Sequence, residues 1–446
     1  MDDEDYIEKM IAEIPDALLP KIKLSEVNEP IPLYIGKFYL ILKERVIQVD
    51  GEIYFSWKPE AGITFNASSP SAIFLSNEHI EEILIPGLDL EHGQVRIHSL
   101  SNEQIKGIIS SPFIIKYVNE PVDCIYFELA NFKNTFGENT KINRAFTNSR
   151  MQWVDKDWQI TIDKLPDFDK VYNQLKSEGG YALTHTGKIT PISGSITHEE
   201  GKTICEKLGL FLSFIKGRRA YPYFLQGFRN DKLCWIDYSA FYVDRHKDVD
   251  SWLPQFDYSG IPELWEGFLK LTLNEDDYQC VDYLLHWYFE ANNNSGFVEG
   301  SIVLLQNAFE LLYNWRVKAK KDTKINADVK IRELLKQAHL PLEFYQDYEE
   351  MLQELKLKKI QFNDFPKLFT LIRNAIVHSN RSKRNQLSNY SGTHRFYIKH
   401  IGLYYMELLL LHLFGYKGKT ANRLPLVRYA GANEELVPWI SIGQNK

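Results

Sequence analysis

The chain has 446 residues, of which 44% are hydrophobic and 25% are charged, and its formal net charge is −7 at pH 7. This length allows two or three domains, and the composition is that of an ordinary globular protein, which excludes a disordered chain. The acidity is uneven: residues 1–259 have a net charge of −10, whereas residues 316–399 contain 18 Lys/Arg against 9 Asp/Glu. A local positive excess of that size is typical of a surface that binds a polyanion.

The cysteines and the hydrophobic segments indicate in which cellular compartment the protein is expected. The four cysteines are scattered without a CxxC pair, which favours a reduced, cytoplasmic protein: Cys124, Cys205, Cys234 and Cys280. The first ten residues are acidic and lack an apolar run, so we expect no signal peptide. The most hydrophobic run, residues 403–414, is interrupted by Glu407 and His412 and is too short to span a bilayer, so we expect a buried helix and no membrane partner.

The first part of the chain reads as β-structure. Short β-branched and aromatic runs, separated by Asn, Gly, Pro and Ser turns, predict an antiparallel sandwich or a barrel-like sheet: LYIGKFYLIL, EIYFSW, SAIFLS, QVRIHSL, FIIKYV, DCIYFELANF and WQITID. The polar stretch from Asn134 to Arg150 is predicted to be a long surface loop. A further strand is predicted over residues 181–190.

A helix and a hairpin close this region. Thr197, followed three residues later by Glu200, predicts a capped helix that runs to about Ile215. Two strands, residues 222–229 and 232–239, are joined by Asn230-Asp231. The Pro- and Gly-containing stretch that follows predicts a boundary, so we expect a β-rich region over residues 1–255 and an all-α region over residues 256–446, an α+β protein overall.

Helical periodicity takes over after the boundary. Helices are predicted at about 263–272, 276–292, 296–320, 327–338, 343–357, 363–380 and 392–414. In the helix over 363–380, apolar residues recur at helical spacing and define a buried face: Phe365, Leu368, Leu371, Ile372, Ala375 and Ile376. Arg373 and His378 then frame the solvent-facing side, with Val377, Asn374 and Thr370 between them. An apolar Val377 in that position indicates a partner helix.

Arg373, Asn374 and His378 resemble the Arg-x4–6-His motif of HEPN-family ribonucleases, in which a polar residue often follows the arginine. The resemblance implies an all-helical domain that forms a homodimer, brings two motif copies together across a cleft, and cleaves RNA without a metal or another cofactor. Histidine titrates near pH 6.5, so His378 would move the proton while Arg373 holds the phosphate. Two other pairs fit the bare pattern, Arg395 with His400 and Arg332 with His339.

The block FLSFIKGRRAYPYFLQGFRNDKLCWIDYS, residues 211–239, resembles the region before the HEPN domain in ApeA-like defence proteins. That resemblance implies a sensing or regulatory β-rich region that meets a phage-derived trigger, and an abortive-infection role through cleavage of tRNA or other RNA. Two alternatives stay open. One is a non-catalytic HEPN-like dimerising scaffold whose β domain binds a protein or glycan, and the other is a β-rich ligand-binding protein with an unrelated helical tail.

Basic residues around the motif are the expected phosphate contacts. The predicted RNA-binding residues are Arg381, Lys383, Arg384, Arg395, Lys399, Lys320 and Lys321. The histidines form no HxxxH or HExxH set, so no metal site is expected. Gly418-Lys419-Thr420 lacks the first glycine of a P-loop, so no nucleotide site of that kind is expected.

Overall fold

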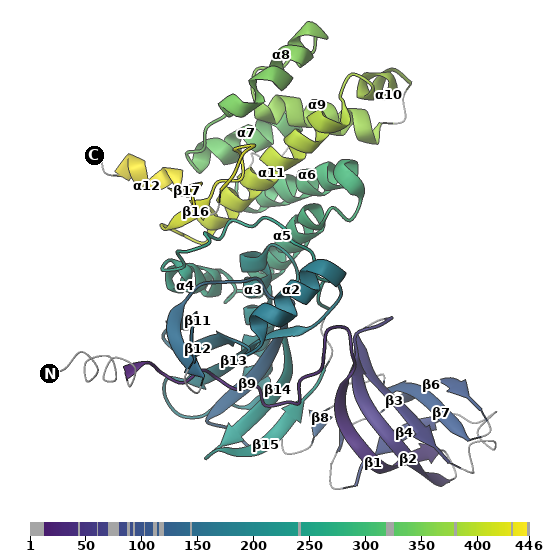
Figure 1. The fold of residues 1–446 in the computed structure, drawn as a ribbon. Coiled ribbons are helices and arrows are strands. Elements are labelled where there is room, and N and C mark those ends of the chain that lie inside the picture. Colours follow the sequence, from purple (N-terminus) through teal and green to yellow (C-terminus); the bar gives the residue numbers. More distant parts are fainter. Residues whose placement is uncertain are drawn as a thin grey trace, which may run out of the picture. The chain divides into compact units, whose positions relative to one another are not determined.

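The computed structural model describes residues 13–42, 45–59, 61–69, 80–86, 90–91, 94–101, 103–109, 114–115, 120–142, 145–239, 242–317, 325–378, 381–429 and 431–443 (Figure 1). The chain divides into two compact units. The first contains Met1–Gly209 and Ala220–Asp248, and the second contains Leu210–Arg219 and Val249–Lys446. The division after Asp248 lies close to the predicted boundary at 255, but the structure also assigns the end of the 197–215 helix region to the second unit.

The first unit is built on two antiparallel sheets, which confirms the β-rich part of the predicted α+β fold. The six-stranded sheet has the order β4-β1-β2-β3-β7-β6, with β1 Ile31–Leu42, β2 Val46–Ser56, β3 Gly62–Ser68, β4 Ile80–Leu84, β6 Val95–Leu100 and β7 Gln104–Ile109. The nine-stranded sheet has the order β10-β11-β12-β13-β9-β14-β15-β8-β5. Its strands are β5 Leu90–Glu91, β8 Ile114–Ile115, β9 Cys124–Ala130, β10 Glu138–Ile142, β11 Ala145–Val154, β12 Trp158–Lys164, β13 Leu183–Pro191, β14 Pro222–Arg229 and β15 Lys232–Asp237.

One hydrophobic core is shared by the two sheets. The strands of the six-stranded sheet alternate buried and exposed residues, as a sheet with one covered face requires. Phe55 of β2 meets two rings of β14, Tyr223 at 5.5 Å and Phe224 at 5.1 Å between ring centroids. These edge-to-face contacts join the sheets through their inward-facing aromatic side chains.

One whole helix and the first part of another, up to Gly209, belong to this unit. The helix α2, Phe168–Glu178, lies against β13 and was not predicted. The helix α3, His198–Lys216, begins where the sequence predicts, because the Thr197 backbone N–H donates to Glu200 Oε2 at 2.9 Å and the Glu200 N–H donates to Thr197 Oγ1 at 3.3 Å. The Asn230-Asp231 turn is also confirmed, since both residues have positive φ, as a tight hairpin turn between β14 and β15 requires.

The loop predicted from Asn134 to Arg150 is wrong, because β10 and the first half of β11 lie within it. Three of its polar residues, Thr140, Ser149 and Arg150, are buried and hydrogen-bonded. Thr140 Oγ1 lies 3.1 Å from Ser149 Oγ, and the Arg150 guanidinium donates to both carboxylate oxygens of Asp163 at 2.9 and 2.7 Å. Polar composition predicted exposure, but these side chains satisfy one another inside the sheet.

Two of the predicted strands fall wholly or partly outside the described residues. The run SAIFLS covers residues 71–76, none of which is described. Of the run FIIKYV, only Ile114–Ile115 is described, and it forms β8. The remaining predicted runs all correspond to strands in the part of the chain that the structure describes.

The second unit is helical, which confirms the C-terminal half of the predicted fold class. Its helices are α4 Ile261–Leu271, α5 Glu275–Asn293, α6 Phe297–Arg316, α7 Ala327–Gln337, η2 Gln346–Tyr348, α8 Glu349–Leu357, α9 Phe365–Val377, α10 Arg381–Leu387, α11 Gly392–Leu413 and α12 Pro438–Gly443. The predicted helix over 363–380 ends three residues early, at Val377, and the separate helix α10 was not predicted. The predicted helix over 343–357 is divided into η2 and α8.

The helix α11 is the centre of this unit and packs against α5, α6, α7 and α9 (Figure 1). Gly402 permits the close approach, since a Cβ at that position would lie 3.1 Å from Leu305 of α6 and 3.2 Å from Phe369 of α9. Residues 398–411 of α11 are buried on every side, as expected for a central helix. Among the helices within the described ranges, none is long and apolar enough to cross a membrane.

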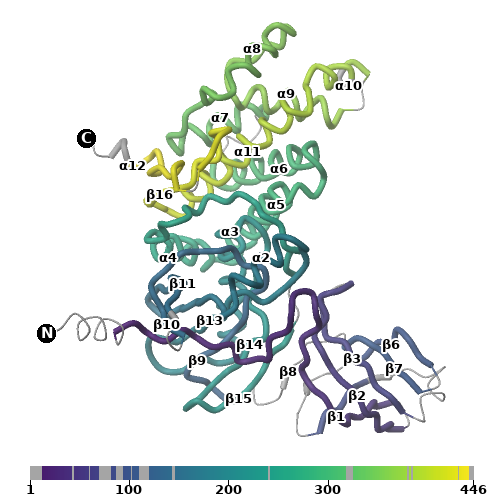
Figure 2. The backbone as a smooth tube through the Cα atoms, in the orientation of Figure 1, coloured from purple at the N-terminus to yellow at the C-terminus, as the bar shows by residue number. Residues whose placement is uncertain are grey.

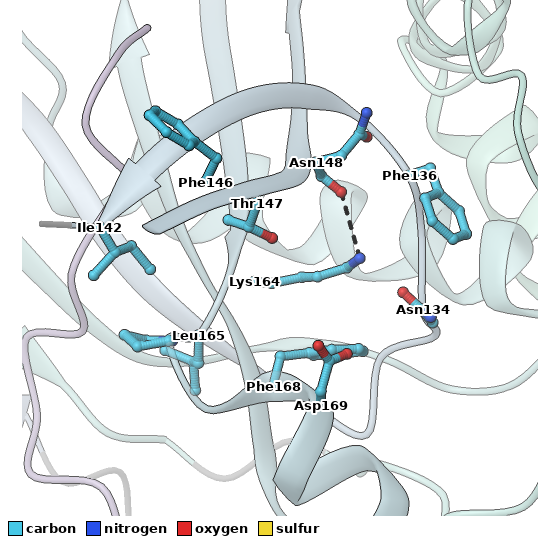
Figure 3. Close-up of a pocket in the computed structure, with 11 residues that line it drawn as sticks. Asn134, Phe136, Ile142, Phe146, Thr147, Asn148, Lys164, Leu165, Phe168 and Asp169 are labelled. Carbon is cyan, nitrogen blue, oxygen red and sulfur yellow. Dashed lines mark hydrogen bonds between the residues drawn. The ribbon is translucent and has the colours of Figure 1, made fainter. Parts of the chain in front are cut away.

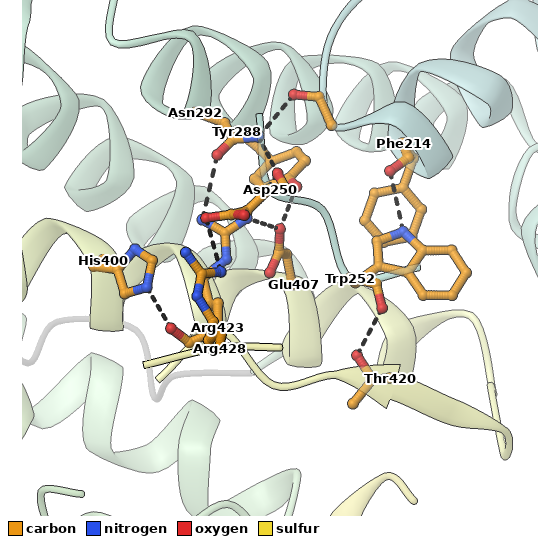
Figure 4. Close-up of polar contacts among 11 residues, drawn as sticks. Phe214, Asp250, Trp252, Tyr288, Asn292, His400, Glu407, Thr420, Arg423 and Arg428 are labelled. Carbon is orange, nitrogen blue, oxygen red and sulfur yellow. Dashed lines mark hydrogen bonds and ion pairs between the residues drawn. The ribbon is translucent and has the colours of Figure 1, made fainter. Parts of the chain in front are cut away.

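The segment after α11 folds back beside that helix (Figure 2) and pairs its own two strands, β16 Lys419–Ala421 and β17 Glu434–Leu436. A buried polar network holds it there (Figure 4). Arg423 donates to Glu407 Oε1 of α11 at 2.5 Å and to Asn292 Oδ1 of α5 at 3.3 Å, and the Tyr288 hydroxyl donates to the same Glu407 oxygen at 2.5 Å. Burial raises the pKa of Glu407, and the Arg423 guanidinium opposes that rise.

Candidate active site

The helix α9 is fixed firmly at its N-terminus. The Asp364 carboxylate caps the helix by accepting a hydrogen bond from the Lys367 backbone N–H at 2.9 Å. The same carboxylate accepts from the Arg332 Nε of α7 at 2.7 Å, so it joins two helices through one buried group. Because Pro366 stands in the first turn, where its missing N–H costs nothing, the start of α9 is locally well determined.

One side of α9 is packed into the core of the unit. Its buried residues are Phe365, Pro366, Leu368, Phe369, Thr370, Ile372 and Ala375. The ring of Phe369 lies 5.6 Å from Phe309 of α6, and the ring of Phe365 lies 5.0 Å from Tyr405 of α11, measured between centroids. Thr370 was expected on the solvent side and is instead buried, so the open side of α9 is narrower than the sequence indicated.

The motif residues occupy that open side. Arg373 and Asn374 are half-buried, whereas Val377 and His378 are exposed, Val377 to 40%. Arg373 Nη1 donates to Asn374 Oδ1 at 3.2 Å, and Arg373 Nε is buried without a hydrogen-bond partner. His378 is the C-terminal cap of α9, with extended backbone angles of φ −89° and ψ 125°. Within the described residues, no carboxylate forms an ion pair with Arg373.

In the second pair that fits the pattern, Arg395 and His400 are both bound to other groups of the protein. Arg395 Nε lies 2.8 Å from Glu299 Oε1, and its Nη1 donates to the Tyr390 carbonyl at 3.0 Å. His400 is buried and hydrogen-bonded through Nε2 to the carbonyl of Arg423. Burial, followed by the nearby Arg423 charge, lowers the pKa of His400 to about 4, so this imidazole is neutral near pH 7.

In the third pair, Arg332 is held by carboxylates, whereas His339 is exposed. Arg332 contacts both oxygens of Asp364, at 2.7 and 3.1 Å, and approaches Asp328 at 3.5 Å. Hydrogen bonding to Asp364 is the largest cause of the raised pKa of Arg332. His339 is exposed at the end of α7, with a positive φ of 56°. An arginine held by two carboxylates is poorly placed to bind a phosphate, because that anion would have to displace them.

The predicted RNA-binding residues fall into three groups. Arg381 is exposed on α10, directly after the motif, and the backbones of Lys383 and Arg384 belong to the same helix. Arg395 is paired as described, and Lys399 is buried, with its ammonium 4.9 Å from the Phe396 ring centroid and 3.5 Å from Asn294 Oδ1. Lys320 and Lys321 lie outside the described residues. The structure therefore leaves the α10 cations, Arg381, Lys383 and Arg384, next to the motif.

Gln306 of α6 was not expected from the sequence to be near the site. Gln306 is fully buried in the otherwise apolar stripe of α6, the helix that packs on α9, and it donates to Glu310 Oε1 at 3.0 Å. Gln306 Oε1 is buried without a partner, as are Thr370 Oγ1 and Arg373 Nε on α9. A polar side chain at a core position lowers the stability of the fold unless its polar atoms are hydrogen-bonded. A glutamine within the stripe at Ile302, Leu305 and Phe309 was the sequence feature that could have revealed it.

The groups that this site offers for chemistry are the exposed imidazole of His378 and the half-buried guanidinium of Arg373. An imidazole can accept or donate a proton, and a guanidinium can hold an oxyanion through two N–H groups. In the part of the chain that the structure describes, no three or more His, Cys, Asp or Glu side chains gather closely enough to hold a metal ion. The described cysteines are free thiols.

Comparison with known proteins gives two family matches. Residues 118–249 match the family described as the YopA central domain, and residues 274–435 match the family described as the YopA C-terminal domain. The chain is 27% identical over 440 residues to the SPbeta prophage-derived uncharacterized protein YopA of Bacillus subtilis (strain 168), with 93% of this chain and 96% of that protein covered. No solved structure matches the chain. The second matched segment lies wholly in the second unit, and the first lies in the first unit except for residues 210–219 and Val249.

Proposed function

We propose that this protein is a metal-independent endoribonuclease of the HEPN type, with Arg373, Asn374 and His378 as its catalytic residues. RNA supplies its own nucleophile in the 2′-hydroxyl group, which attacks the adjacent phosphate. His378 takes or returns the proton, and Arg373 binds the phosphate oxygens and the charge that develops on them. The products are a 2′,3′-cyclic phosphate and a 5′-hydroxyl end. Asn374, which accepts a hydrogen bond from Arg373, orients the guanidinium.

One observation supports this choice of residues above the others. Of the three Arg-x4–6-His pairs in the sequence, Arg373 and His378 are the pair whose arginine has no carboxylate partner in the described ranges and whose histidine is exposed. Arg395 and Arg332 are held by carboxylates, and His400 is buried. A site that must receive RNA needs an accessible imidazole and an arginine free to bind phosphate.

The proposed enzyme is a homodimer through the helical unit. Val377 is apolar, is 40% exposed, and lies between Arg373 and His378 in sequence on the open side of α9. A second copy that packs on this side would cover Val377 and bring two motifs together, as the HEPN resemblance implies. The α10 cations follow directly and would contact the RNA backbone.

The proposed biological role is defence against phage through cleavage of tRNA or other RNA in the cytoplasm, with the β-rich unit receiving a phage-derived trigger. This part of the proposal rests on the resemblance to ApeA-like proteins. The prophage origin of the YopA relative supports a setting in which phages and their hosts compete.

Purified protein tests the proposal directly. RNA is incubated with the protein in EDTA, and the cleaved ends are analysed for 2′,3′-cyclic phosphate. We expect His378→Ala to lower the cleavage rate on the order of 10²–10⁴-fold. The matched control is His339→Ala, which removes another exposed histidine of the same unit and should cleave like the wild type.

Two outcomes contradict the proposal. Cleavage by His378→Ala at the wild-type rate shows that the catalytic residues lie elsewhere. Intact RNA after incubation with the wild-type protein, together with a stable dimer, favours the non-catalytic scaffold instead, whose β-rich unit binds a protein or glycan.

A further inference from the structure

A pocket of about 480 Å³ opens within the first unit, far along the chain from the proposed catalytic residues (Figure 3). Its walls come from β11, from the end of β12, from the first turn of α2, from the segment before β10 and from the last residue of β10. Three phenylalanine rings line it: Phe136, Phe146 and Phe168. A volume of this size admits a ligand of one or two rings with its substituents.

Lys164, the last residue of β12, lies inside this pocket. Its side chain is buried, with only 7% of the residue exposed. Its ammonium lies 5.0 Å from the ring centroids of both Phe136 and Phe168, and it donates one long hydrogen bond, 3.5 Å, to the Asn148 carbonyl (Figure 3). The electron-rich faces of the rings attract the cation, but they do not accept conventional hydrogen bonds from its N–H groups.

The charge of Lys164 is poorly compensated by the protein. No carboxylate lies within ion-pair distance of it among the described residues, and burial lowers its pKa. The charge of Asp169 opposes this lowering of the pKa, but Asp169, which also lines the pocket, is exposed to water and therefore well screened. A buried ammonium has three donors, and two of them remain for a ligand. Because the cation lies within the pocket, a positively charged ligand would be repelled.

We propose that this pocket binds a small anionic ligand with a flat aromatic body, whose carboxylate or phosphate group is held by Lys164. The anion takes the unused ammonium donors, and the rings of Phe136, Phe146 and Phe168 contact the flat body. The start of α2 at Phe168 adds the positive end of a helix dipole to the same pocket. Binding here is independent of the proposed ribonuclease activity, although in an RNA-cleaving protein such a ligand would be a candidate trigger.

The full-length protein is titrated with two fluorescent probes of similar shape. One is 1-anilinonaphthalene-8-sulfonate, which carries a negative charge, and the other is the neutral N-phenyl-1-naphthylamine. We expect one site per chain for the anionic probe. Lys164→Met should weaken the anionic probe on the order of tenfold or more, because one charge-assisted hydrogen bond is lost, and should leave the neutral probe almost unchanged.

Matched variants separate charge from shape. Lys156→Met removes an exposed lysine from the turn before β12 and should change neither affinity. Phe146→Ala truncates a ring that is 47% exposed, so it should cost little stability and weaken both probes. If near-ultraviolet circular dichroism shows that Lys164→Met does not fold, the Phe146→Ala variant tests whether the probes bind in this pocket. Displacement of the anionic probe by benzoate or by phenyl phosphate then identifies which anion the site prefers.

Three results overturn the proposal. They are equal affinity of Lys164→Met and wild type for the anionic probe, unchanged binding of both probes to Phe146→Ala, and displacement by neither benzoate nor phenyl phosphate. None of these readouts uses RNA, so a failure here leaves the ribonuclease proposal intact. Likewise, an inactive ribonuclease would not alter the binding result.

Discussion

The buried carboxyl group of Glu128 should make the stability of the first unit depend on pH. It lies in β9, between β13 and β14 in the nine-stranded sheet, and only 1% of it is exposed. Its Oε1 accepts a hydrogen bond from the Lys21 backbone N–H at 3.1 Å, while its Oε2 is buried without a partner. Burial raises the pKa of Glu128 from 4.5 to about 8. The folded protein therefore keeps this carboxyl protonated at pH values where the unfolded chain ionises it.

The sign and size of the effect follow from that difference. Because the folded pKa is the higher one, the stabilising contribution is complete below pH 4.5 and is lost as the pH rises toward 8. At roughly 1.4 kcal/mol per pH unit, the loss between pH 5 and pH 7 is about 2.5 kcal/mol. Glu128→Gln replaces the protonated acid with an amide of the same shape, which keeps the acceptor for Lys21 and cannot ionise.

Urea denaturation of wild type and Glu128→Gln at pH 5 and pH 7 measures this quantity. We expect similar free energies of unfolding at pH 5, and an advantage for the variant that grows by about 2.5 kcal/mol at pH 7. Taking the difference between the two proteins removes the contribution of all other titrating groups. A difference that stays constant with pH would refute the reasoning, because it would mean that Glu128 ionises in the folded state as readily as in the unfolded chain.

Three further predictions concern the helical unit. Val377→Glu places two like charges in the proposed dimer seam and should weaken dimerisation and RNA cleavage together, so an unchanged dimer in sedimentation would contradict it. Arg423→Met leaves Glu407 buried without its cation and should destabilise the unit by about 3–5 kcal/mol in urea, with much of the loss recovered when Glu407→Leu is added. Neutralising all three α10 cations should weaken binding to most RNAs and reduce its salt dependence by about 0.7 per lost phosphate contact, whereas an unchanged slope would show that they do not contact the backbone.

The elements whose information is local were predictable from the sequence. The capped start of α3 at Thr197 and Glu200, the Asn230-Asp231 turn, and the division into β-rich and helical parts all agree with the structure. The amphipathic pattern of α9 also identified most of its buried face, except that Thr370 is buried and that Leu371 and Ile376 are only half-buried. These features depend on residues no more than a few positions apart, so a pattern in one chain is enough to reveal them.

The contacts of the charged residues depend on the tertiary structure and could not be predicted from the sequence. The three Arg-x4–6-His pairs are equivalent as patterns, and they separate only because Asp364 holds Arg332, Glu299 holds Arg395, and the core encloses His400. The buried ammonium of Lys164 and its aromatic surroundings are likewise invisible as a motif, since the residues that meet there lie in different elements.

The strands β10 and β11 show the same limit in the fold itself. Their polar composition predicts a solvated loop, yet Arg150 finds Asp163 on the neighbouring strand and Thr140 meets Ser149, so both pairs are buried at little cost. Secondary structure follows from the spacing of side chains along the chain. Burial and ionisation follow from which distant groups that spacing brings together, because a charge or a hydroxyl is stable inside a protein only where a partner meets it.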